Sequence, residues 1–122
     1  MPDTLQHVAG TPVLVCAADG EPLRGEREAV DLLGEAFSCQ AAWVAIPAER
    51  LGEGFFRLRT RVAGEILQKF ANYRLGVAVV GDITRHVEAS TALRDFVVES
   101  NRGGHVWFVP DLEALRERLG QA

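Results

Sequence analysis

Hydrophobic residues occur along this chain in two kinds of pattern. Short apolar runs occupy residues 13–17, 41–46, 75–80 and 105–109, and such runs are typical of strands that are covered on both faces. Between them, apolar residues recur every three or four positions, as in amphipathic helices that pack one side against a core. The pattern therefore predicts strands that alternate with helices.

The expected boundaries follow from turn and cap residues. Residues 4–9 and 12–17 are predicted to be extended segments separated by a turn at Gly10-Thr11-Pro12. Helices are expected from Gly25, from Phe56 to Tyr73, from Ser90 or Thr91 to Gly103-Gly104, and after Pro110. In the longest of them, the apolar stripe consists of Leu58, Val62, Ile66, Leu67 and Phe70.

The predicted order of elements is β-β-α-β-α-β-α-β-α. Strands and helices that alternate with short connections favour a mostly parallel sheet with right-handed crossovers. The first strand reaches the second through a tight turn, so we expect it to be an antiparallel edge strand. The sequence predicts a single layered α/β domain over residues 1–122.

Composition places the chain among folded proteins of the cytoplasm. Its 122 residues are 48% hydrophobic and 25% charged, which excludes a disordered chain. No apolar run approaches the roughly 20 residues of a membrane helix, and residues 1–10 do not resemble a signal peptide. We therefore expect a cytoplasmic protein with no membrane partner, in which Cys16 and Cys39 are small buried side chains.

Charge is distributed unevenly along the chain. The formal net charge is −4, yet residues 54–86 contain six basic and two acidic residues. A net acidic domain argues against nucleic acid as a partner. The middle of the chain is instead a basic island within an acidic protein.

The most distinctive candidate site lies in this island. Thr60 is predicted near the start of the long helix, and Arg57, Arg59 and Arg61 surround it at alternating positions. A phosphate on Thr60, or on a partner, would find charge-assisted donors there. The alternative is that Thr60 only caps a helix and that the arginines form a solvated face.

Catalytic patterns are not evident. The three histidines lack metal-ligand spacing, and the chain contains no nucleophile elbow, Walker A loop or dinucleotide fingerprint. We predict no metal, no cofactor and no catalytic residue. Asp82 follows the strand at 75–80, where ligands of open α/β sheets bind, although an aspartate in a loop more often bonds its own backbone.

Several segments resemble a known family. The residues 63–74, Val79-Val80-Gly81-Asp82, Leu93-Arg94-Asp95-Phe96 and Glu99-Ser100-Asn101 resemble the bacterial domain-of-unknown-function family numbered 4180. That resemblance extends from Pro12 to Leu119 and implies no activity.

The order of elements is also similar to that of STAS-type anti-sigma-factor-antagonist domains. In that family, a partner kinase phosphorylates a serine of an Asp-Ser-Ser-Gly motif at the start of the second helix. The counterpart here is Leu58-Arg59-Thr60-Arg61, which shares only the hydroxyl of Thr60.

Three functions are therefore compatible with the sequence. The leading hypothesis is a small regulatory or protein-interaction module that presents the region around Thr60 to a protein partner. The first alternative is a domain that binds a small molecule or anion through the same arginines, and the second is an enzyme that uses Asp82, Glu65 and Lys69. A homodimer formed through the first strand, with Leu5 and Val8, is as compatible with the sequence as a monomer.

Overall fold

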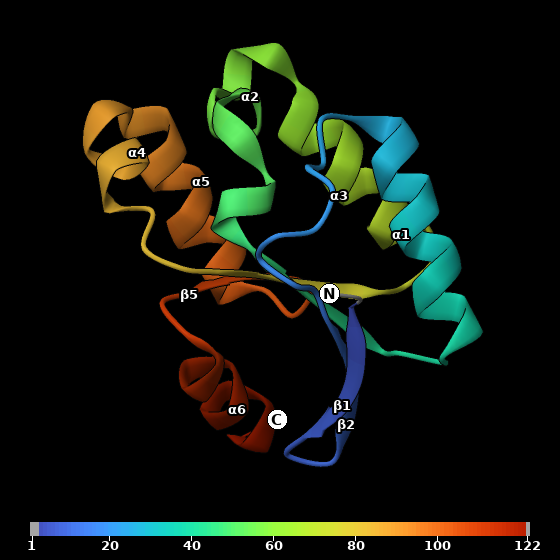
Figure 1. Cartoon of the computed structure of the whole chain (residues 1–122). Coiled ribbons are helices and arrows are strands. Elements are labelled where there is room, and N and C mark those ends of the chain that lie inside the picture. Colours follow the sequence, from blue (N-terminus) through green and yellow to red (C-terminus); the bar gives the residue numbers. More distant parts are fainter. Residues whose placement is uncertain (1–2, 122) are drawn as a thin grey trace.

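The fold is a five-stranded sheet whose strands lie in chain order. The computed structural model describes residues 3–121 (Figure 1). The strands are β1 (Thr4–Val8), β2 (Thr11–Val15), β3 (Trp43–Pro47), β4 (Gly76–Val80) and β5 (Val106–Val109). β1 pairs antiparallel with β2, and the other three pairs are parallel. These observations confirm the α/β fold and the antiparallel edge strand; residues 1, 2 and 122 of the predicted domain lie outside the described residues.

Within residues 3–121, six helices flank the sheet. They are α1 (Glu26–Ser38), α2 (Gly52–Phe56), α3 (Val62–Asn72), α4 (Thr84–Ala89), α5 (Thr91–Arg102) and α6 (Leu112–Gln121), with two 3₁₀ turns, η1 (Ala48–Arg50) and η2 (Leu58–Thr60). Figure 1 shows α1 to α5 on one face of the sheet and α6 on the other. Right-handed crossovers place helices on one face when each new strand is added in the same direction.

The two faces of the sheet bury two cores. The larger core lies under α1, α3 and α5 and includes Phe55, Ile66 and Phe70, which are almost completely buried. The smaller core lies between the sheet and α6. There the Trp43 and Trp107 rings lie 4.3 Å apart, and the Arg118 guanidinium lies 4.2 Å from the centre of the Trp107 ring.

The turn between β1 and β2 is one residue earlier than predicted. Ala9 and Gly10 form a two-residue loop with φ of 51° and 83°, and Thr11 and Pro12 already belong to β2. Two successive left-handed residues define the turn whose twist matches a β-hairpin. The hairpin is therefore tight, and β1 is held in register with β2 along its whole length.

The predicted long helix from Phe56 to Tyr73 is wrong. The chain forms α2 and η2 and then reverses at Arg61, whose φ is 65°, before α3 begins. α4, which the sequence analysis did not predict, follows Asp82 and Ile83. As a result, α2 and η2 follow the carboxyl end of β3, and α4 follows the carboxyl end of β4. Among the described residues, none of the helices has the length and apolar content of a membrane span.

Candidate functional site

A cleft of about 650 Å³ lies between the α2–η2 segment and α4 with the start of α5. We call it the arginine cleft. Its lining residues are Glu53, Phe56, Arg57, Leu58, Arg59, Arg85, His86, Ala89, Ser90 and Ala92. Three arginines thus share one hollow with a single acidic residue, and four apolar side chains, His86 and Ser90 complete the lining.

Thr60 supports one wall of this cleft. Its Oγ1 lies 2.6 Å from the carbonyl oxygen of Gly54 and 2.8 Å from that of Arg57, so its hydroxyl proton is held between two acceptors. The same oxygen accepts a hydrogen bond from the backbone N–H of Val62 at 3.3 Å. Thr60 therefore ties η2 back to α2 and forward to the first turn of α3. It fixes the segment that carries Arg57 and Arg59.

An aromatic stack joins the two walls. The Phe56 ring and the His86 imidazole lie 4.2 Å apart at an interplanar angle of 11°, and Phe56 also packs edge-on against Phe55. Desolvation, and then the charge of Arg85, lower the pKa of His86 below its ordinary value, against a weaker opposing effect of Glu53. The neutral imidazole is therefore the favoured form near pH 7.

Glu53 is the internal counter-ion of the arginines. Its carboxylate lies 3.2 Å from Nη2 of Arg57 and 3.9 Å from Nη2 of Arg85. The exposed fractions of these side chains are 62% for Glu53 and Arg57 and 79% for Arg85. Exposed pairs of this kind contribute at most about 1 kcal/mol, so another anion can replace the Glu53 carboxylate at little cost.

A second hollow of about 440 Å³ adjoins the first and shares Glu53, Phe56, Arg85 and His86 with it. Asp82 and Glu49 line this hollow at the carboxyl ends of β3 and β4. The Asp82 carboxylate accepts hydrogen bonds from the hydroxyl and the backbone N–H of Thr84, and these bonds lower its pKa. Asp82 thereby holds the turn into α4, which presents Arg85 and His86.

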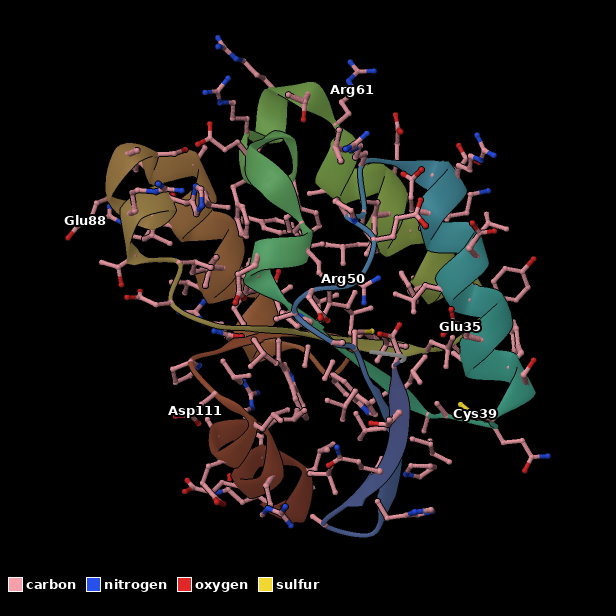
Figure 2. All side chains as sticks on the ribbon, viewed as in Figure 1. Glu35, Cys39, Arg50, Arg61, Glu88 and Asp111 are labelled. Atoms are coloured by element: carbon pink, nitrogen blue, oxygen red, sulfur yellow. The ribbon has the colours of Figure 1, made fainter. Side chains whose placement is uncertain are left out.

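The residues predicted from the sequence do not all meet. Arg57 and Arg59 line the arginine cleft, whereas Arg61 and Glu65 line a neighbouring hollow. Figure 2 shows the Arg61 side chain pointing out from the start of α3. Arg61 therefore does not join the other two arginines.

The residues considered for an enzyme do not meet at one site: Glu65 and Lys69 lie one turn apart on α3, whereas Asp82 follows β4 and lines a different hollow. Lys69 pairs with Glu26 on α1, with 2.8 Å between Nζ and Oε1, and this contact raises its pKa. Glu65 and Arg61 line one hollow, whereas Asp82 lines the second hollow described above, together with Glu53. The geometry does not bring these three together as a nucleophile, a base and a proton donor. Residues 3–121 also contain no group of three or more His, Cys, Asp or Glu arranged to hold a metal ion.

The residues of the cleft that the sequence analysis missed include Glu53, Arg85 and His86. Arg85 belongs to the basic island, but its position beside Arg57 depends on α4. The spacing Asp82-Ile83-Thr84 was the available signal, because an aspartate side chain often accepts a hydrogen bond from the backbone N–H two residues later, at the start of a short helix.

Comparison with known proteins gives a family for nearly the whole chain. The family described as Domain of unknown function (DUF4180) matches residues 8–119. No curated protein and no solved structure matches the chain.

Proposed function

The chain belongs to the DUF4180 family, whose description assigns it no function, and we propose that it is a binding module that captures an acidic segment of a protein partner in the arginine cleft. The observation that carries the proposal is the placement of Arg57, Arg59 and Arg85 around one hollow with an apolar lining. A regulatory role in the cytoplasm, as expected from the sequence, is part of this proposal.

The lining matches a segment that is both acidic and partly apolar. Phe56, Leu58, Ala89 and Ala92 supply apolar surface, on which a hydrophobic side chain of the partner would be shielded from water. The arginines around them are planar donors that suit carboxylates and phosphates. A partner carboxylate would take the place of Glu53 between Arg57 and Arg85.

The solvent exposure of the arginine side chains favours a protein partner over a small molecule. Small-molecule sites enclose about 70–90% of their ligand. In the arginine cleft, the exposed fractions of Arg57 and Arg85 are 62% and 79%, so these guanidinium groups extend into solvent. Side chains placed in this way reach a surface that approaches the cleft from outside.

In this proposal, Thr60 holds in place the wall of the cleft that carries Arg57 and Arg59. A phosphate on its hydroxyl would break the contacts with Gly54 and Arg57 and would place negative charge next to the arginines. The phospho-switch predicted from the sequence would then act by loosening the wall of the cleft, and it stays a prediction.

The test compares two triple variants with the same change in charge. The cleft variant carries Arg57→Glu, Arg59→Glu and Arg85→Glu. The control variant carries Arg27→Glu, Arg102→Glu and Arg116→Glu, which are exposed and lie outside the cleft. Arg102 and Arg116 also pair with a glutamate nearby in the chain, as Arg57 does with Glu53, so the control matches the loss of surface ion pairs.

Each protein is used to capture partners from an extract of the host, and bound proteins are identified by mass spectrometry. We expect one partner at fixed stoichiometry with the wild type and with the control variant, and its loss with the cleft variant. A partner that binds the cleft variant equally well would contradict the proposal.

The cleft volume of about 650 Å³ supports a second candidate, a small anionic ligand held by the same arginines. A thermal-shift screen of phosphorylated metabolites separates the two functions, because a ligand that binds the folded state raises the midpoint of unfolding. A rise that the cleft variant abolishes, without any captured protein, would favour the small ligand.

A further inference from the structure

The two edge strands of the sheet, β5 and β1, differ in what their outward backbone groups bond. At β5, the side-chain amide of Asn101 bonds the strand backbone: its Oδ1 accepts from the N–H of Phe108 at 2.7 Å, and its Nδ2 donates to the carbonyl oxygen of Phe108 at 3.3 Å. The Arg118 guanidinium in turn donates to the backbone carbonyl of Asn101 at 2.7 Å. Side chains thus occupy the positions that a further strand would take beside β5.

β1 forms the opposite edge, and its outward backbone groups can be assigned from its register. Val8 and Thr11 close a two-residue turn and are therefore a hydrogen-bonded pair. Pairs alternate along an antiparallel ladder, so Leu5 and His7 belong to non-hydrogen-bonded pairs. Pro12, opposite His7, agrees with this assignment, because proline has no N–H to give β1 and its carbonyl instead accepts from Ala42 at 2.8 Å.

The N–H and C=O groups of Leu5 and His7 consequently point away from β2, at the free edge of the sheet. The first four residues of β1 are exposed, and only Val8 is buried. Val8 was expected to be exposed and to take part in pairing at this edge. That expectation is wrong, because its side chain packs in the core beneath α6. Exposed edge strands are normally protected by charge, proline or a bulge, and β1 contains none of these.

We propose that β1 pairs antiparallel with β1 of a second copy of this chain, which joins two sheets into one of ten strands. A two-fold axis at Gln6 places Leu5 opposite His7 of the second copy, and His7 opposite Leu5. Both pairs are then of the hydrogen-bonded kind, and four hydrogen bonds satisfy all the outward groups of the two residues in each copy. The strand is self-complementary in this register.

Charge also favours a second copy as the occupant of this edge. In a contact across a two-fold axis, a residue near the axis lies close to the same residue of the second copy. A charged side chain there would therefore be repelled by the same charge on the second copy. β1 contains no Asp, Glu, Lys or Arg, so none of its residues near this axis carries a carboxylate, ammonium or guanidinium group. The register places Gln6 opposite its duplicate, where two side-chain amides can bond each other.

The strand is also held in place before it pairs. Asp3, directly before β1, accepts a hydrogen bond from the backbone N–H of Ala17 at 2.9 Å and forms an ion pair with Arg50 at 3.0 Å. The tight turn at Ala9-Gly10 holds the other end. A strand fixed at both ends loses little conformational freedom on pairing.

The test measures the mass of the full chain in solution by light scattering and sedimentation, between about 1 and 500 µM. We expect the wild type to form a dimer within this range. His7→Pro removes the outward N–H without touching a β1–β2 hydrogen bond, and it should weaken dimerisation at least about tenfold. His7→Ala keeps the N–H and is the matched control, which should still dimerise.

Backbone hydrogen exchange of the wild type provides a measurement that does not depend on a variant. The amides of Leu5 and His7 should exchange more slowly as protein concentration rises, whereas exposed amides outside β1 should not change. A wild type that is monomeric at about 500 µM, or a dimer that His7→Pro leaves intact, would overturn the proposal.

Discussion

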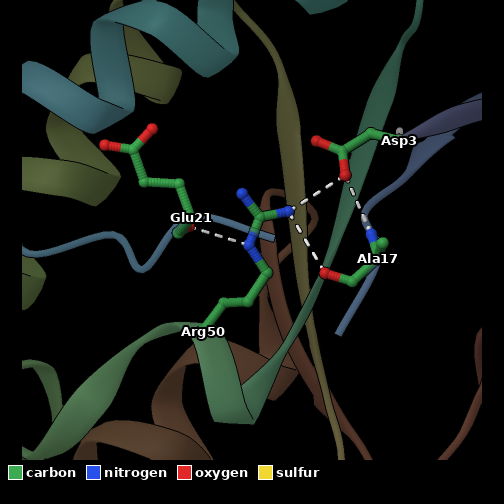
Figure 3. Close-up of polar contacts among 4 residues, drawn as sticks. All are labelled: Asp3, Ala17, Glu21 and Arg50. Atoms are coloured by element: carbon green, nitrogen blue, oxygen red, sulfur yellow. Dashed lines mark hydrogen bonds and ion pairs between the residues drawn. The ribbon is translucent and has the colours of Figure 1, made fainter. Parts of the chain in front are cut away.

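Arg50 and Asp3 form a buried ion pair, with 3.0 Å between Nη1 and Oδ1 and only 8% of each side chain exposed. Figure 3 shows the Arg50 guanidinium between Asp3, the carbonyl of Ala17 and the carbonyl of Glu21. One side chain after β3 therefore holds both the start of β1 and the loop after β2. Gly20 permits this placement, because a Cβ there would lie 2.6 Å from Cζ of Arg50.

We expect Asp3→Ala to lower the free energy of unfolding by about 3 kcal/mol, because it leaves the Arg50 charge buried without its counter-ion. Chemical denaturation measures the change. The double variant Asp3→Ala with Arg50→Met removes the stranded charge and should be more stable than the single variant. A loss below about 1 kcal/mol in the single variant would show that the pair contributes little.

Gly76 makes room for an indole ring. A Cβ at Gly76 would lie 2.3 Å from two ring carbons of Trp43, which faces it across the β3–β4 pair. Gly76→Ala should therefore displace Trp43 from Trp107, shift the tryptophan fluorescence and cost about 1–3 kcal/mol. Gly64→Ala in α3 is the control, since no atom lies near that position, and it should stabilise the helix by about 0.5–1 kcal/mol. Equal effects of the two substitutions would argue against this role of Gly76.

The two thiols should differ in reactivity. Cys16 is 4% exposed, and burial, followed by the negative charge of Asp3, raises its pKa to about 12. At pH 8 only about one molecule in ten thousand would carry the reactive thiolate. Cys39 is half-buried. A thiol reagent should therefore label one cysteine in the folded protein and both after unfolding, and Cys39→Ser should abolish the native signal; rapid labelling of Cys16 would contradict its burial.

Asn101 should stabilise the β5 edge. Asn101→Leu removes both hydrogen bonds to Phe108 and leaves an N–H and a C=O without partners, so we expect a loss of about 1–3 kcal/mol. Asn72→Leu is the control, because the Asn72 side chain is exposed and bonds the exposed Gln68, and it should change stability by less than about 0.5 kcal/mol. Light scattering should also show that the Asn101 variant associates more readily, because its strand edge is open.

The strands were predictable because their signal is local. The apolar runs that contain β2 and β4 are buried on both faces, so their composition alone identified them. The predicted long helix failed because Leu58 and Val62 continue the apolar spacing of α3 across the break. The spacing of apolar residues indicates which side chains face the core, but it does not indicate that the chain reverses at Arg61.

The candidate site was predicted only in part for a related reason. Arg57 and Arg59 are close in sequence, so their shared surface was visible as a basic island. Arg85 and His86 reach the same cleft through the fold, from a helix of six residues that is too short for a clear period. The burial of Arg50 had no local signal at all, because an arginine in a loop is normally exposed.

The stack of His86 on Phe56 should give the arginine cleft a measurable titration. Desolvation and the charge of Arg85 lower the pKa of His86 in the folded state, whereas an unfolded chain titrates near 6.5. The unfolded state therefore binds more protons below that pH, and the contribution of His86 to stability is present above about 6.5 and decreases as the pH falls through its folded pKa. An NMR titration should place the pKa of His86 in the folded protein below its ordinary value of 6.5. Glu53→Gln should lower it further and Arg85→Gln should raise it, because the first removes a negative neighbour and the second a positive one. A pKa that neither substitution moves would show that the two charges do not act on the imidazole.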